Sequence, residues 1–351
     1  MSTLIHTLTA LAYEWDASDL FIAAGHPARL KVKGVIHERA DSIITEQDME
    51  QFCQSCGLVT AGLRDHDTAW YSPEGVRFRV NIHRSTGRLG AVLRQIRSEV
   101  ASMEELGLPS EVMGTWLRQS SGLILVSGPT GCGKSTTVAS SLEWLSSVRS
   151  GHIITIEDPI EYLFKDQMAF FTQREVGVDT PDYNTGLQRA LRQAPDVIFL
   201  GEIRQPETAM TCLQAAETGH VVISTLHTAC VTETFDRLSS LIPSNERDAM
   251  LGLLSQRLLG VLSQRLLPRQ DTHGQMLICE YMTVNGAVRD WIRNMDWAAL
   301  SDHMKRGDDP ANRSFLHSLI AATQGGYIDA DLASSHAGNA FEFSRAMRGI
   351  S

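Results

Sequence analysis

The chain has 351 residues, of which 43% are hydrophobic and 21% charged, and its net charge is −10. This length favours two domains, since a single hydrophobic core stops growing at about 250–300 residues. The negative charge repels phosphate backbones, so nucleic acid is not expected as a partner. No run of about 18 apolar residues occurs, so no membrane-spanning helix is expected.

The N-terminus and the cysteines predict a cytoplasmic protein. Residues 1–19 lack the basic lead and the cleavage site of a signal peptide. Leu4 and Leu8 belong to a helical spacing of apolar residues, which predicts an amphipathic helix. The six cysteines include one CxxC pair, Cys53 and Cys56, and no second pair completes a zinc site. All six are therefore expected to be reduced structural thiols.

Residues 1–100 are rich in predicted strands. Apolar residues on both sides of Gly34 predict a hairpin, and residues 78–83 alternate apolar and polar side chains with the period of a half-buried strand. Residues 45–57 are predicted to form a helix that starts with a capping box. The polar segment 101–119 is predicted to be a hinge between two domains.

From residue 120 onward, short buried strands alternate with helical patterns, which predicts an α/β fold with a parallel sheet covered on both faces. These strands are predicted at 123–127, 152–156, 197–200 and 221–224. The chain beyond about residue 235 is predicted to be mostly helical. The tetrapeptide Gln-Arg-Leu-Leu occurs at 256–259 and again at 264–267, and we interpret this as one helix that shows the same face twice.

The segment 128–135, Gly-Pro-Thr-Gly-Cys-Gly-Lys-Ser, matches the pattern G-x-x-x-x-G-K-[ST] between a predicted strand and a predicted helix. Glycines allow backbone N–H groups to point at phosphate oxygens, and the helix N-terminus adds positive potential. Lys134 is expected to contact the β- and γ-phosphates, and the Ser135 hydroxyl to bind Mg²⁺. The residues expected to bind ATP here are Gly128, Thr130, Gly131, Cys132, Gly133, Lys134, Ser135 and Thr136.

Polar side chains follow three of the predicted strands. Glu202 emerges at the C-terminal end of its strand, where ligands of open α/β sheets bind, and is expected to activate the attacking water and to join Ser135 at the metal. Glu157 follows another buried strand, where a carboxylate suits metal-assisted hydrolysis. A solvated glutamate at a strand end is the alternative for Glu202. His227 ends a third strand. A lone histidine is more often structural than catalytic, but its place at the carboxyl end of a strand in the same sheet makes a functional role equally plausible.

Four segments in this order resemble the PilT family, the retraction ATPases of type IV pili within the secretion-ATPase superfamily. GPTGCGKST is similar to the Walker A segment of that family, ITIEDPIEY to its Asp box, DVIFLGEIR to its Walker B segment and GHVVISTLHT to its His box. The resemblance begins near the N-terminus with ASDLFIAAGHPARLKVKG and continues to the segment at 286–294, so it covers nearly the whole chain.

The resemblance implies a homo-hexameric ATPase motor that hydrolyses ATP with Mg²⁺ to retract type IV pili. It implies a PAS-like N-terminal α/β domain at 1–100 and a RecA-like P-loop ATPase domain with a helical tail at 120–351. It further implies that Glu157 and Glu202 are the catalytic carboxylates and that His220 and His227 sense the nucleotide.

The implied location is the cytoplasmic face of the inner membrane, peripheral and not spanning. The implied partners are an inner-membrane pilus platform protein and a paralogous retraction ATPase.

Six arginines fall within residues 77–97 of this acidic chain. One interpretation is a solvated strand face. The other is an arginine finger that reaches the nucleotide of a neighbouring subunit and stabilises the charge of the transition state. The matching region of related ATPases points at the nucleotide, and on that basis Arg79 and Arg94 are the candidates.

The sequence departs from the PilT pattern at Cys132, where serine is usual, at Gln205, where aspartate is frequent, and at Asn294, which replaces a final glutamate in a segment tied to retraction. A pilus-assembly or type II secretion ATPase is one alternative, disfavoured here by the short N-terminal region and the lack of a four-cysteine motif. A non-hydrolysing ATP-binding ring partner is a second. A RecA-like nucleic-acid translocase is a third, and the net charge disfavours it.

Overall fold

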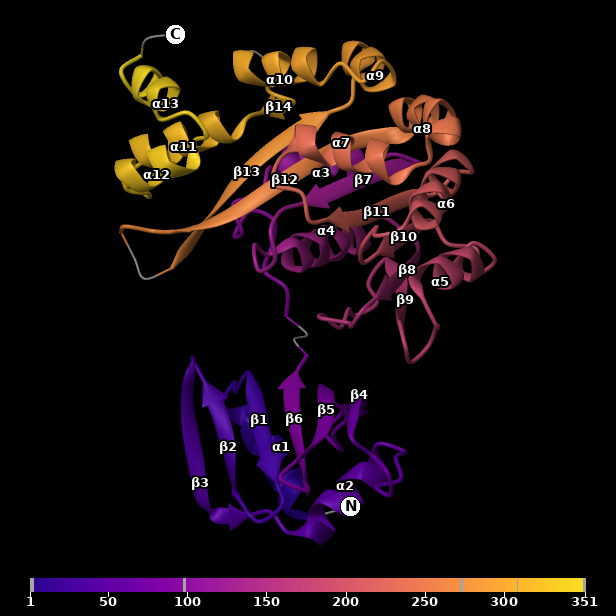
Figure 1. Cartoon of the computed structure of the whole chain (residues 1–351), viewed down its shortest axis with the longest axis vertical. Helices are drawn as coiled ribbons and strands as arrows, with labels where there is room; N and C mark the ends of the chain where they lie inside the picture. The colour runs from indigo at the N-terminus through magenta and orange to yellow at the C-terminus, as the bar shows by residue number, and fades with distance from the viewer. Residues whose placement is uncertain (1–2, 97–98, 272–273, 308, 350–351) are drawn as a thin grey trace. The chain divides into compact units, whose positions relative to one another are not determined.

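The computed structural model describes residues 3–96, 99–271, 274–307 and 309–349. It divides into two compact units, one of Met1–Ser98 with Pro159–Leu163 and one of Glu99–Asp158 with Phe164–Ser351. Each unit contains its own β-sheet, with helices packed against it (Figure 1). The predicted α/β class is therefore confirmed.

The first unit is built on a six-stranded antiparallel sheet in the order β3-β2-β1-β6-β5-β4. Its strands are β1 (Asp19–Ala23), β2 (Pro27–Val32), β3 (Val35–Ile43), β4 (Asp65–Tyr71), β5 (Arg77–Ser85) and β6 (Arg88–Gln95). Its helices are α1 (Thr3–Glu14) and α2 (Glu46–Ser55), which share one hydrophobic core with the sheet.

Local sequence patterns explain this unit well. Phe78, Val80 and Ile82 of β5 are buried in the core, while the polar residues between them are more exposed, as the alternation predicts. The capping box of α2 is present: Thr45 Oγ1 accepts from the Asp48 amide at 3.1 Å, and Asp48 Oδ2 accepts from the Thr45 amide at 2.9 Å. The predicted hairpin joins β2 and β3.

The second unit contains an eight-stranded sheet in the order β14-β13-β12-β7-β11-β10-β8-β9. The strands from β12 to β9 in this order are parallel, and β13 and β14 are antiparallel additions. The strands are β7 (Gly122–Ser127), β8 (Gly151–Glu157), β9 (Ala169–Glu175), β10 (Val197–Leu200), β11 (Val221–Leu226), β12 (Leu258–Pro268), β13 (Gln275–Thr283) and β14 (Asn312–Arg313).

Helices cover both faces of this sheet and continue beyond it. They are α3 (Ser110–Leu117), α4 (Lys134–Val148), α5 (Tyr183–Ala190), α6 (Pro206–Glu217), α7 (Val231–Leu241), α8 (Ser244–Arg257), α9 (Gly286–Arg293), α10 (Trp297–Arg306), α11 (Phe315–Gln324), α12 (Ala330–His336) and α13 (Ala340–Met347). In Figure 1 the last three helices lie together beside β13. No helix within the described residues has the length and apolar character needed to cross a bilayer.

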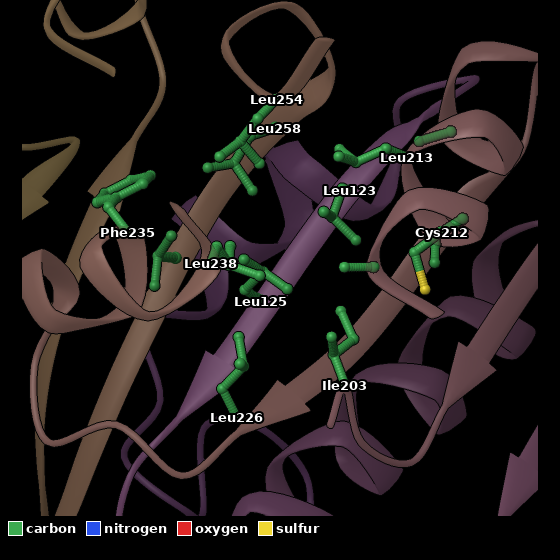
Figure 2. Packing of buried hydrophobic residues seen from close by; sticks show 14 of the residues in the cluster. Leu123, Leu125, Ile203, Cys212, Leu213, Leu226, Phe235, Leu238, Leu254 and Leu258 are labelled. Carbon is green, nitrogen blue, oxygen red and sulfur yellow. The ribbon is translucent and has the colours of Figure 1, made fainter. Parts of the chain in front are cut away.

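The central strands are buried on both sides, and their alternate residues enter two different cores. Figure 2 shows Leu123 and Leu125 of β7 among side chains of α6, α7 and α8, including Leu213, Phe235 and Leu254. The intervening residues of the strands pack with α3 and α4 on the other face, among them Ile124, Val126, Ile153, Val197 and Ile223. The predicted parallel sheet with two covered faces is confirmed.

The prediction of a continuous helix through 256–267 is wrong. Helix α8 ends at Arg257, and Leu258–Pro268 forms strand β12. Pairing decides the outcome, because β12 is hydrogen-bonded to β7 on one side and to β13 on the other, and its apolar residues enter both cores. The helical tail accordingly begins at Gly286 and not near residue 235.

The segment 101–119, expected to be a hinge, is packed into the second unit. It contains α3, and the side chains of Met103, Leu108 and Trp116 are buried in the core that includes α4. The Trp116 indole also donates to Thr283 Oγ1 of β13 at 3.0 Å. The polar composition of this segment concealed an apolar face that only the packing reveals.

Candidate nucleotide-binding site

The candidate site lies at the carboxyl ends of three neighbouring parallel strands. Ser127 at the end of β7 pairs with Leu226 at the end of β11, and β11 pairs in turn with β10. The segment 128–133, Glu202 and His227 follow these strands, so all emerge at the same edge of the sheet. This edge is where ligands of open α/β sheets bind.

The loop 128–133 has the curled backbone that the glycine pattern predicts. Gly128 and Gly133 have φ angles of 147° and 88°, and Gly133 is the N-cap of α4. A Cβ atom at Gly128 would lie 2.5 Å from Cys132 Sγ and 2.5 Å from the Gln264 carbonyl oxygen, so a larger residue would force the loop or β12 to shift. The loop thus ends at a helix N-terminus, an arrangement that binds anions.

Lys134 and His227 meet at this loop. The buried Lys134 ammonium donates to the carbonyl oxygens of Gly128 at 2.8 Å and of Pro129 at 3.2 Å. His227 Nδ1 lies 3.5 Å from Lys134 Nζ and 3.4 Å from Thr130 Oγ1. The structure therefore brings the loop lysine and the histidine after β11 into one cluster.

Glu202 joins the same cluster from β10. Its Oε1 lies 3.3 Å from His227 Nε2, and its Oε2 accepts from Arg204 Nε and Nη2, both at 2.8 Å. The Glu202 carboxylate raises the pKa of Arg204 above its ordinary value. His227 thus connects the phosphate loop to the carboxylate through its two ring nitrogens.

Glu157 ends the strand beside β10. Its side chain is buried, and its Oε1 accepts from Thr155 Oγ1 at 2.7 Å and from Gln173 Nε2 at 3.4 Å. Burial, followed by the charges of Asp158 and Glu202, raises the pKa of the Tyr183 phenol, so that this hydroxyl stays protonated. Tyr183 is therefore a neutral side chain near the carboxylates of these strand ends.

Three residues of this site escaped the sequence reasoning. Arg204 holds Glu202, Tyr183 lies among the carboxylates, and Gln264 contacts the loop from β12. The single available signal was a polar Gln-Arg pair inside the apolar run at 258–268. That signal was obscured because the run was interpreted as a helix.

His220 is not part of this site, contrary to expectation. It precedes β11, at the amino ends of the parallel strands, whereas the loop lies at their carboxyl ends. Its carbonyl oxygen accepts from the Gly122 amide at 3.0 Å. Its Nδ1 lies 3.0 Å from the Ala215 carbonyl oxygen. The length of β11, about 20 Å at 3.3 Å per residue, separates it from His227. The resemblance implied that both histidines sense the nucleotide, but strand β11 between them leaves only His227 beside the loop of this chain.

Arg79 and Arg94 are neighbours on the first unit. They are directly opposite each other on β5 and β6, and Arg94 Nε donates to the buried Asp19 carboxylate at 2.8 Å. Both line a hollow of about 390 Å³. Arg97 lies outside the described residues. A role for these arginines at a nucleotide remains a prediction.

The strand, the curled loop, helix α4 and the acidic strand ends define a P-loop nucleotide-binding protein. A family model described as Type II/IV secretion system protein matches residues 3–314. The chain belongs to this family.

Individual relatives narrow the similarity. The chain is 36% identical over 319 residues to the type IV pilus retraction ATPase PilT of Pseudomonas aeruginosa, covering 86% of this chain and 89% of the relative. It is 33% identical over 349 residues to the type IV pilus ATPase PilU of the same organism, covering 95% and 88%. A crystal structure of the pilus retraction motor PilT with bound ADP superposes with a TM-score of 0.88 at 35% identity, covering 97% of this chain and 99% of that chain. The resemblance to the PilT family is confirmed.

Proposed function

We propose that this chain is the subunit of a ring-shaped motor that hydrolyses ATP to retract type IV pili and so drive twitching motility. The observation that carries the proposal is the cluster of Lys134, His227 and Glu202 at the mouth of a P-loop. The similarity to PilT over most of both chains supports the pilus as the load.

The loop and its surroundings fit an ATP–Mg²⁺ substrate. The glycine backbone and the start of α4 offer N–H donors to phosphate oxygens. The Lys134 ammonium, bonded to the loop's own carbonyls, can transfer its hydrogen bonds to the β- and γ-phosphates. Mg²⁺ prefers hard oxygen ligands, which the Ser135 hydroxyl and the Glu202 carboxylate supply.

We assign the activation of water to Glu202, with Glu157 on the adjacent strand as a second carboxylate. Arg204 fixes one Glu202 oxygen and leaves the other directed toward His227. His227 contacts both the loop and Glu202, so it is suited to report on the terminal phosphate. General-base assistance of this kind contributes about 10²–10⁴-fold to the rate.

We place the ATPase activity in the second unit and the PAS-like domain in the first. In a homo-hexameric ring, Arg79 and Arg94 of the first unit would act on the nucleotide bound by another subunit. The proposed setting is the cytoplasmic face of the inner membrane, where a pilus platform protein receives the motion. A paralogous retraction ATPase is a further proposed partner.

A second candidate is a regulatory ring partner of another retraction ATPase. Pseudomonas aeruginosa holds two pilus ATPases similar to this chain, PilT and PilU, so a chain of this family can occur together with a paralogue in one organism. In that case this chain would still carry the cluster of Lys134, His227 and Glu202, but pilus retraction would depend on the paralogue. The two candidates differ in the effect of removing this protein alone.

Deletion of the gene in the native host, scored by counting surface pili, tests the proposal. An excess of pili that do not retract is expected, and the same excess is expected when the deletion is complemented with the Lys134→Ala variant. Loss of pili would contradict retraction and indicate a pilus-assembly ATPase. A normal number of pili would favour the ring partner.

A further inference from the structure

Gln264 joins strand β12 to the phosphate loop. Its side chain is fully buried, and both ends of its amide are hydrogen-bonded. Nε2 donates to the Cys132 carbonyl oxygen at 2.6 Å, and Oε1 accepts from Thr137 Oγ1 at 2.9 Å. One side chain thus holds the loop and the first turn of α4 together.

The bond to Cys132 determines where an amide of the loop points. A trans peptide is planar, and its C=O and N–H groups point in opposite directions. Since the Cys132 carbonyl is held toward β12, the N–H of Gly133 in the same peptide is directed away from β12. Phosphate binding by such a loop requires N–H groups that point inward.

The strand that carries Gln264 is itself fixed to the loop. Ser263 pairs with Ser127, the residue before the loop, and their hydroxyl oxygens lie 2.6 Å apart. The Gln264 carbonyl oxygen fills the space that a side chain at residue 128 would need. Gln264 therefore contacts the loop near both of its ends.

We propose that Gln264 is a positioning residue for nucleotide binding, which holds the peptide between Cys132 and Gly133 in the orientation that binds phosphate. The inference rests on the proposed nucleotide site. The alternative is a purely structural role, in which Gln264 only satisfies buried polar groups. The two roles differ in their effect on nucleotide affinity at equal stability.

The test measures binding of fluorescent ATP, steady-state ATP hydrolysis and thermal unfolding on the full chain. Gln264→Leu is expected to weaken ATP affinity about tenfold, because a loop N–H donor is no longer held in place. The KM should rise with little change in kcat, since the loop binds substrate and transition state alike. Thr137→Val, which removes one of the two hydrogen bonds of the Gln264 amide, should give a smaller loss of ATP affinity. Thr137→Ser, which keeps the hydroxyl, should bind ATP with wild-type affinity.

Thr283→Val is the matched control. It removes two hydrogen bonds of β13, to the Trp116 indole and to the Ala311 carbonyl, away from the loop. It should lower the unfolding temperature without changing ATP affinity. Wild-type ATP affinity in a folded Gln264→Leu variant would overturn the inference, and so would equal losses of ATP affinity in Gln264→Leu and Thr283→Val. A wild-type protein that binds no ATP would instead overturn the nucleotide site itself.

Discussion

Gly128→Ala should damage both the stability of the second unit and its capacity to bind ATP. The added methyl group would lie 2.5 Å from Cys132 Sγ and 2.5 Å from the Gln264 carbonyl oxygen, at a φ of 147°. The backbone conformation costs about 1–3 kcal/mol in a residue other than glycine. Overpacking costs about another 1–3 kcal/mol. Relief of this strain would shift the loop that holds the phosphates.

The assay for Gly128→Ala is thermal unfolding together with ATP binding. A loss of about 2–6 kcal/mol corresponds to a fall of roughly 5–20 °C in a unit of this size. Gly219→Ala is the control, because its φ is 104° but no atom lies within 4 Å of the added Cβ. It should show the backbone cost alone and normal ATP binding. Equal stability of the two variants, with normal ATP binding in both, would refute the reasoning.

Three further predictions concern other parts of the chain. Burial raises the pKa of Glu280 in the folded state above its ordinary value of 4.5. The contribution of the protonated side chain to the free energy of unfolding is therefore complete below pH 4.5 and is lost as the pH rises through the raised pKa. Calorimetry should therefore show a smaller fall in unfolding temperature between pH 4.5 and 7 for Glu280→Gln than for the wild type, and identical falls would contradict this. Arg94→Ala should reduce ATP turnover by about 10³-fold or more at unchanged ATP binding, whereas Arg88→Ala on the same strand should not, as steady-state assays can check. Burial raises the pKa of the Cys132 thiol, so alkylation near pH 7 should be slow, and Cys132→Ser should keep near-normal ATP affinity because the loop binds through its backbone.

The parts of the fold that follow from local pattern were predictable. Short apolar runs ended by polar residues predicted β7, β8, β10 and β11, because strands buried on both faces leave little room for polar side chains. The convergence of Glu202 and His227 on the loop followed from their places after parallel strands. Their contacts with each other and with Lys134 needed coordinates, since side-chain directions are not encoded in spacing.

The missed features depend on pairing between distant segments. The run at 258–268 has no unambiguous period, and its position between β7 and β13 makes it a strand. The role of Gln264 depends on its hydrogen bond to Cys132, which lies more than a hundred residues earlier in the chain. His220 was assigned to the nucleotide site because it belongs to a segment that resembles the His box. It precedes β11 and therefore lies at the end of this strand that is remote from the loop.

ATP binding and hydrolysis by the purified full chain, compared with Lys134→Ala and Glu202→Ala, test the central claim most directly. The wild type should bind and hydrolyse ATP when magnesium is present, and Lys134→Ala should lose binding or turnover. Glu202→Ala should retain ATP binding while its turnover falls by about 10²-fold or more. Turnover at the wild-type rate by Glu202→Ala would contradict the assigned chemistry.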